Sequence, residues 1–192
     1  MTPKHTVTVY CASANNLAPI YTEAAAALGQ ALAKAGATIV TGAGRTGLMG
    51  AVADAALAAG GSVTGIIPRF MVERGWHHSG LTELRITEDM HERKSTMAAL
   101  ATAAVALPGG IGTFEELMEI ITWRQLGLFG GNVVIFNVNN YYGPLISMLE
   151  QAVEQGFMRP DHRQLYTIAE SVDEVLAAAF AEPSKAEFSP KF

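Results

Sequence analysis

The sequence has few of the features that are typical of disulfide-rich, nucleic-acid-binding or membrane proteins. Its 192 residues include one cysteine, Cys11, which excludes an internal disulfide framework and fits a reducing compartment. Charged residues make up 16% of the chain, form no basic run and give a net charge of −5, so nucleic acid is not an expected partner. There is no run of about 18 apolar residues and no signal-peptide segment, which argues against a membrane partner. We therefore expect a cytoplasmic protein.

Short β-branched runs alternate with longer helical patterns along the whole chain. The expected strands are 6–10, 38–41, 62–67, 104–107, 133–137 and 165–169, and the expected helices are 20–35, 48–59, 91–102, 113–126, 142–155 and 172–179. This alternation predicts an α/β fold in which helices cover both faces of a parallel sheet. Gly36, Gly60 and Gly156 stand where helices end. We expect one domain over residues 1–181 and a flexible tail over 182–192.

The most distinctive segment runs from Leu107 to Glu116 and reads LPGGIGTFEE. A glycine loop between a strand and a helix presents bare backbone N–H groups at the positive end of the helix dipole, which is a ready anion site. The same residues permit a purely structural interpretation, because Thr113 and Glu116 fit a capping box with Thr113 at the N-cap. The bare loop before them favours a phosphorylated substrate.

Four segments are expected at the carboxyl edge of the sheet, where ligands bind in such folds: residues 11–16, 42–50, 68–80 and 108–113. Residues 42–47 spell GxGxxG, but they follow the second expected strand, and Ile67-Pro68-Arg69 stands where a dinucleotide site needs an acidic residue. A packing or phosphate-adjacent turn is therefore favoured over a nicotinamide site.

Two further clusters contain side chains that are candidates for binding a phosphate or a metal. Arg93 and Lys94 open a helix; such residues are more often solvated, but beside the glycine loop they would complement a phosphate. His77 and His78 are adjacent, point in different directions and match no zinc spacing, so we expect no metal site.

These residues carry a family resemblance. The segment 108–116 fits PGGxGTxxE and the segment 90–97 fits MHxRKxxM. With Gly47-Leu48-Met49-Gly50, the helix segment 121–127 and the segment 139–145, they resemble the LOG (Lonely Guy) family of cytokinin riboside 5′-monophosphate phosphoribohydrolases, once labelled lysine decarboxylases. The resemblance covers residues 7–165.

The resemblance implies a Rossmann-like, doubly wound α/β/α fold in one domain, a homodimer and no cofactor. It implies hydrolysis of the N-glycosidic bond of a nucleoside 5′-monophosphate, typically one with an N6-substituted adenine, to free base and ribose 5-phosphate. The catalytic pair carried over is Arg93 and Glu116. The implied substrate- and phosphate-binding residues are Ser13, Gly44, Gly47, Met90, Lys94, Pro108, Gly109, Gly110, Ile111, Gly112 and Thr113.

Several positions depart from the family pattern around the pocket: Ala43, Ala14, Gly131-Asn132 and Gly75, the last where many members carry a substrate-contacting glutamate. Alternatives therefore stay open. The chain is a cytokinin-specific enzyme, a general purine or pyrimidine 5′-nucleotide nucleosidase, or a non-catalytic carrier or sensor of a phosphorylated ligand. A decarboxylase is least favoured, because it would need a Schiff-base lysine for pyridoxal phosphate and only Lys94 lies near the expected site.

Overall fold

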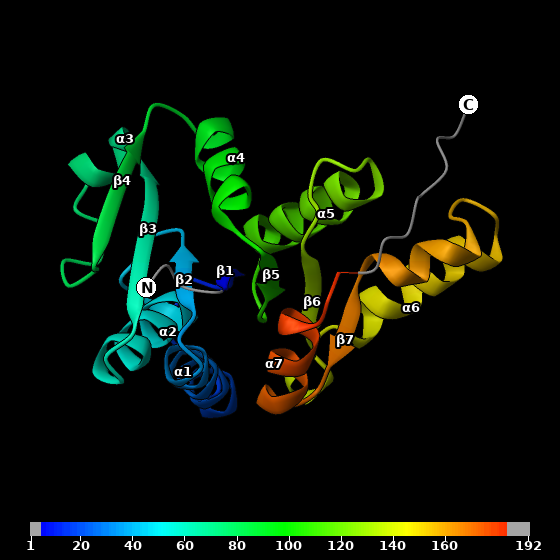
Figure 1. The fold of residues 1–192 in the computed structure, drawn as a ribbon, viewed down its shortest axis with the longest axis horizontal. Helices are drawn as coiled ribbons and strands as arrows, with labels where there is room; N and C mark the ends of the chain where they lie inside the picture. Colours follow the sequence, from blue (N-terminus) through cyan, green and yellow to red (C-terminus); the bar gives the residue numbers. More distant parts are fainter. Residues whose placement is uncertain (1–4, 184–192) are drawn as a thin grey trace.

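The structure, a computed structural model, describes residues 5–183, which form one parallel seven-stranded sheet between two layers of helices (Figure 1). The strands are β1 (Thr6–Tyr10), β2 (Thr38–Thr41), β3 (Ser62–Pro68), β4 (Glu83–Thr87), β5 (Ala103–Ala106), β6 (Asn132–Phe136) and β7 (Thr167–Ala169). The helices are α1 (Pro19–Lys34), α2 (Gly47–Ala58), α3 (Arg69–Glu73), α4 (Met90–Leu100), α5 (Ile111–Gln125), α6 (Gly143–Glu154) and α7 (Val172–Phe180), with 3₁₀ turns η1 (Val138–Asn140) and η2 (Pro160–Leu165).

The strand order, β4-β3-β2-β1-β5-β6-β7, fixes where a ligand can bind. The chain builds outward from β1 to β4, returns through α4, and continues on the other side of β1 with β5. The order therefore reverses between β1 and β5, and ligands of open α/β sheets bind at the carboxyl ends of the strands at such a switch point. The segments 11–16 and 107–110 leave the sheet there.

Two apolar clusters hold the helices to the sheet. Helices α1, α2 and α7 pack on one face, with Leu28, Val52 and Val175 buried against β1 residues such as Val7 and Val9. Helices α4, α5 and α6 cover the other face and bury the second cluster, which includes Met97, Leu117, Ile120, Tyr142 and Leu149. Both faces of the central strands are thus covered, which explains their near-continuous apolar sequences.

The expected α/β architecture is confirmed. The expected strands match β1, β2, β3, β5, β6 and β7 with shifts of one or two residues. Gly36, Gly60 and Gly156 have φ of +76°, +77° and +78°, the left-handed conformation expected after a helix. Within residues 5–183, no helix has the length and apolar content that a membrane crossing requires.

Two expectations about the elements need correction, and a third concerns residues that lie mostly outside the described part of the chain. The edge strand β4 and the short helix α3 were not expected; Leu84 and Ile86 alternate with charged residues in β4, which hides it in the sequence. The expected helix 91–102 is two residues too long at its end, because α4 ends at Leu100 and β5 begins at Ala103. Most of the expected flexible tail, residues 184–192, lies outside the described residues.

Candidate functional site

Helix α4 carries two basic side chains into the protein interior. Its N-cap is Asp89, whose Oδ1 accepts a hydrogen bond from the Glu92 backbone N–H at 2.8 Å. This cap fixes the first turn so that Arg93 and Lys94 point inward, with only 6% and 8% of their surfaces exposed. The interpretation of these two residues as solvated surface charges is therefore wrong. Burying two cations requires partners, and both have them.

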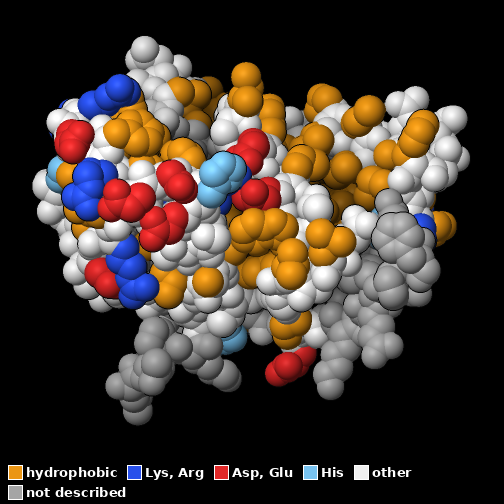
Figure 2. Space-filling view, turned by 90° about the horizontal axis from the view of Figure 1, so that it is seen from above, with side chains coloured by type: hydrophobic (Ala, Val, Ile, Leu, Met, Phe, Trp, Pro, Cys, Tyr) orange, Lys and Arg blue, Asp and Glu red, His pale blue; other side chains and the backbone are white. Residues whose placement is uncertain are grey.

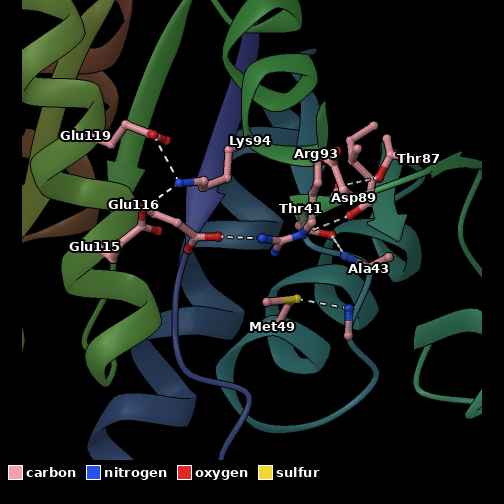
Figure 3. A network of polar contacts seen from close by, with 12 residues as sticks. Thr41, Ala43, Met49, Thr87, Asp89, Arg93, Lys94, Glu115, Glu116 and Glu119 are labelled. Atoms are coloured by element: carbon pink, nitrogen blue, oxygen red, sulfur yellow. Dashed lines mark hydrogen bonds and ion pairs between the residues drawn. The ribbon is translucent and has the colours of Figure 1, made fainter. Parts of the chain in front are cut away.

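Arg93 pairs with Glu116 across the site (Figure 3). Its Nη1 lies 2.8 Å from Glu116 Oε1, and its Nε donates to the Ile66 carbonyl at 3.2 Å. The two side chains are only 8% and 10% exposed, which makes this a desolvated ion pair. Gly42 leaves the room for it, because a Cβ at this position would lie 2.0 Å from Arg93 Nη2.

Burial also sets the protonation of Glu116. Desolvation raises the pKa of this carboxyl above its ordinary value, and the charge and hydrogen bond of Arg93 offset only part of that rise. A carboxylate with a raised pKa is a better proton acceptor than a solvated one. Cys11 lies nearby, and burial followed by the negative charge of Glu116 raises the pKa of its thiol, so it is protonated at neutral pH and a poor nucleophile.

Lys94 is held by two carboxylates of helix α5 (Figure 3). Its Nζ forms ion pairs with Glu115 and, at 3.0 Å, with Glu119. Burial alone would lower the pKa of Lys94, but the hydrogen bonds to these two glutamates outweigh it and raise the pKa. A lysine that forms a Schiff base must lose its proton readily. Lys94 therefore does not fit the role of a lysine that binds pyridoxal phosphate.

The glycine loop differs from the expected capping box. Helix α5 begins at Ile111, after Gly110 as the N-cap, and no side chain caps it. The expectation that Thr113 is the N-cap is wrong, because the N-cap is Gly110, three residues earlier, and Glu116 turns to Arg93 instead. The uncapped first turn leaves backbone N–H groups available to an anion, as the loop sequence predicts.

Two tyrosines that follow β6 form hydrogen bonds to backbone carbonyls at the glycine loop. The Tyr142 hydroxyl donates to the Leu107 carbonyl at 2.7 Å, and the Tyr141 hydroxyl donates to the Gly109 carbonyl at 2.5 Å. Both carbonyls thereby have a hydrogen-bond donor within the protein. The close fit also needs Gly109, where a Cβ would lie 2.0 Å from Thr113 Oγ1. These tyrosines were not expected to contribute to the site, although the segment 139–145 carries part of the family resemblance.

The GxGxxG segment packs the neighbouring loops together. Gly47 has φ of +62°, and a Cβ there would meet the Ala14 carbonyl oxygen at 2.5 Å. The Thr46 hydroxyl donates to the Ser13 carbonyl at 2.7 Å, and Gly44 N–H lies 2.9 Å from Met49 Sδ. Ala43 takes φ of +63°, so the residue that departs from the family pattern occupies a left-handed position usually given to glycine.

Two adjoining cavities open at the Arg93–Glu116 pair. The first, which we call the glycine-loop cavity, has a volume of about 360 Å³, and the second, the Trp76 cavity, has about 410 Å³. The glycine-loop cavity is lined by Cys11, Ala12, Ser13, Ala14, Met49, Met71, Met90, Arg93, Gly110, Gly112, Thr113, Glu115 and Glu116. The Trp76 cavity is lined by Ser13, Gly42, Gly44, Thr46, Met49, Ile67, Met71, Trp76 and Arg93. They share Ser13, Met49, Met71 and Arg93, so one ligand can extend through both.

Most residues expected at the site are brought together, with some exceptions. Of the expected set, Ser13, Met90, Arg93, Gly110, Gly112, Thr113 and Glu116 line the glycine-loop cavity and Gly44 lines the Trp76 cavity. Gly47, Lys94, Pro108, Gly109 and Ile111 line neither cavity, and Ile111 is 87% exposed. Met71 and Trp76 line the cavities without having been expected there.

The position that departs most from the family pattern is left without a carboxylate. Gly75 has φ of +68° and open space where a Cβ would be. Glu73, two residues earlier, is exposed at the end of α3 and lines neither cavity, so it does not replace the missing glutamate. His78 does not face the cavities either: its Nε2 lies 2.9 Å from Asp54 Oδ1 and its Nδ1 accepts from the Gly80 N–H.

Comparisons with known proteins identify the family of this chain. A family model described as "Possible lysine decarboxylase" matches residues 49–179. A cytokinin riboside 5′-monophosphate phosphoribohydrolase of Rhodococcoides fascians is 42% identical over 179 residues, 92% of this chain and 89% of the relative. The enzyme LOG of Oryza sativa subsp. japonica, which has the same activity name, is 41% identical over 170 residues, 88% of this chain and 70% of the relative.

A solved structure of the molybdenum cofactor carrier protein of Chlamydomonas reinhardtii aligns with a TM-score of 0.69 and 20% identity, covering 91% of this chain and 95% of that one. At this identity the likeness shows the three-layer fold alone. The family model, in contrast, spans helices α4 and α5, which hold Arg93 and Glu116. The two relatives are also 42% and 41% identical over most of this chain. The chain therefore belongs to the LOG family.

Proposed function

We propose that this protein hydrolyses the N-glycosidic bond of an N6-substituted adenosine (cytokinin riboside) 5′-monophosphate. Water adds to the anomeric carbon of the ribose, the bond to the base breaks, and the base leaves with a proton, giving free base and ribose 5-phosphate. The observation that carries the proposal is the buried Arg93–Glu116 pair between an uncapped helix N-terminus and a second cavity. The relatives described above, whose names state this activity, support it.

The 5′-phosphate is proposed to bind in the glycine-loop cavity. The N–H groups of residues 110–113 open helix α5 without a side-chain cap, so a phosphate oxygen can accept from them and also meets the positive end of the helix dipole. Glu115 and Glu116 border the same cavity. The phosphate therefore has to sit at the loop end, with the ribose toward Glu116, because a dianion placed beside these carboxylates would be repelled.

Glu116 is proposed to act on the reacting centre. Breaking the glycosidic bond builds positive charge on the ribose, and a buried carboxylate stabilises that charge strongly because little water screens it. Its raised pKa also suits it to take the proton of the attacking water. Arg93 orients this carboxylate through the 2.8 Å bond and reaches both cavities. Binding of the 5′-phosphate, away from the bond that breaks, holds the ribose in position next to Glu116.

The test is release of free base from a panel of 5′-monophosphates: isopentenyladenosine monophosphate, AMP, GMP, CMP and UMP. Glu116→Gln removes the charge with little change of shape, and Glu154→Gln makes the same change at an exposed position of α6. We expect hydrolysis of the isopentenyl compound, a loss of about 100-fold or more in Glu116→Gln, and no loss in Glu154→Gln. Faster hydrolysis of plain nucleotides would instead make the protein a general nucleosidase. Binding of nucleotides without any hydrolysis would make it a carrier.

A homodimer is proposed on the strength of exposed apolar side chains at the two ends of α5. Ile111 is 87% exposed at its start, and Leu126 and Leu128 are 63% and 71% exposed just after its end. Figure 2 shows apolar side chains spread between charged clusters over the face seen from above. A second copy would cover such surface. Light scattering should give twice the 20.3 kDa chain mass, and a monomer at micromolar concentration would exclude the dimer.

The free thiol of Cys11, buried at 5% exposure, is consistent with a reducing compartment, and we propose a cytoplasmic location. Fractionation of cells that express the protein tests this directly. Recovery with a secreted or membrane fraction would refute it.

A further inference from the structure

The Trp76 cavity has an unusual lining for a site next to a reacting centre. Its walls are formed by Ile67, Met49, Met71 and Trp76 together with the backbone of the 42–44 turn. Among the residues that line it, Arg93 carries the only charge, and no side chain is a carboxylate or an amide. Ser13 and Thr46 contribute hydroxyls, and the Thr46 hydroxyl already donates to the Ser13 carbonyl at 2.7 Å. Most side chains that line this cavity are apolar, so shape, stacking and apolar contact dominate the recognition of a group that enters it.

Trp76 precedes two histidines that hold the loop against the turn at residues 42–44. His77 forms a bridge with Gly44, and the His78 N–H donates to the Ala43 carbonyl at 2.8 Å. The His78 side chain also bonds to Asp54 of α2 at 2.9 Å. The loop therefore lies across the 42–44 turn, which holds the backbone of Trp76 beside the cavity.

Arg74 supports the indole from outside. Its guanidinium carbon lies 5.1 Å from the centre of the Trp76 ring and 5.6 Å from the centre of the Phe70 ring, distances typical of cation–π contacts. Trp76 nevertheless remains 47% exposed. A large aromatic side chain that borders a cavity and is half exposed offers apolar surface that a ligand can cover.

We propose that Trp76 is the specificity-determining residue for the base: the indole forms the wall against which the purine and an apolar N6 substituent lie. This inference rests on the proposed function for the orientation of the substrate. With the phosphate at the glycine loop and the ribose at Glu116, the base extends past Arg93 into the Trp76 cavity, because the two cavities meet there. Gly75 contributes no side chain, so apolar contact with Trp76 carries the selection.

The first test compares two substrates in the same variant, so that any general loss of activity cancels. The quantity is kcat/KM for isopentenyladenosine monophosphate divided by kcat/KM for AMP. We expect Trp76→Ala to lower this ratio about tenfold or more, the usual effect of removing apolar contact with a substrate group. Trp76→Phe should restore most of it, and Met148→Ala, which truncates an exposed apolar side chain on α6, should leave it unchanged. A ratio within twofold of the original in Trp76→Ala would overturn the proposal.

The second test measures binding without turnover. The chain has two tryptophans, so Trp123→Phe leaves Trp76 as the only indole fluorophore. Combined with Glu116→Gln, this variant should show quenching of Trp76 fluorescence as isopentenyladenosine monophosphate is added, and much weaker quenching with ribose 5-phosphate, which has no base to stack. Quenching in a protein whose original form releases no base would refute the proposed reaction and keep the Trp76 site. Nucleotide binding by calorimetry without quenching, or no binding at all, would refute the site.

Discussion

A single methyl group added at Gly42 should disable the site without unfolding the protein. The backbone of Gly42 lies outside the left-handed region, so alanine fits its conformation. Its Cβ, however, would lie 2.0 Å from Arg93 Nη2 and 3.1 Å from Arg93 Cζ, well inside van der Waals contact. The guanidinium must move, and it then loses its bonds to Glu116 at 2.8 Å and to the Ile66 carbonyl at 3.2 Å.

The expected size of the effect follows from the bond that is lost. A hydrogen bond between charged groups contributes about 1.5–3 kcal/mol. If Glu116 is oriented for the transition state by this bond, its loss lowers kcat/KM about 10- to 100-fold, at about 1.4 kcal/mol for each factor of ten. The protein should still fold, because the displaced atoms are the end of a long side chain and Gly→Ala reduces the entropy of the unfolded chain. Its Tm should nevertheless fall, because the buried charges of Arg93 and Glu116 lose their partner.

The assay is base release together with thermal unfolding of the same samples. Gly130→Ala is the matched control, since a Cβ there has open space and the backbone is not left-handed. In an Arg93→Met background, Gly42→Ala should cause no further loss, because the group it displaces is already gone. A folded Gly42→Ala protein with activity within twofold of the original would refute the role given to the Arg93–Glu116 pair.

Two further predictions concern the protonation of Glu116 and the support of the glycine loop. Because burial raises the pKa of Glu116 and the reaction needs its ionised form, activity should fall as the pH drops through that raised pKa; the acid limb of kcat/KM should lie above the ordinary value of 4.5, and a limb at or below 4.5 would contradict the effect of burial. Tyr142→Phe leaves the Leu107 carbonyl without its 2.7 Å bond, which should cost about 1–3 kcal/mol and lower Tm by about 2–10 °C. Tyr21→Phe, whose hydroxyl bonds to no described residue, should leave Tm unchanged.

The fold could be predicted from the sequence because its signals are local. Strands such as Ala103–Ala106 are buried on both faces and read as apolar runs, and a glycine such as Gly36 marks a helix end because the left-handed conformation favours it. The strand β4 was missed for the opposite reason. It lies at the edge of the sheet with much of its surface exposed, so Glu83 and Arg85 are tolerated within it.

The site could be predicted only in part, because one sequence pattern is compatible with two different interactions of Glu116. The sequence Thr-x-x-Glu at 113–116 fits a capping box, and nothing local indicates that the helix begins at Ile111 instead. The carboxylate of Glu116 is taken by Arg93, 23 positions earlier in the chain. Trp76 was not predicted at the site, because the two histidines beside it resemble metal ligands in the sequence. In the structure these histidines hold the loop that carries the indole.

The Arg93–Glu116 pair is a consequence of topology. Helix α4 must return from the edge strand β4 to β5 at the centre of the sheet, so it crosses over β3 and β2 and its buried face passes above the carboxyl end of β1. Helix α5 starts from the same place, directly after β5. A residue in the first turn of α4 and one in the second turn of α5 therefore face each other at the switch point. Burial there makes each charge depend on the other, which couples the position of Glu116 to Arg93 and to the space left by Gly42.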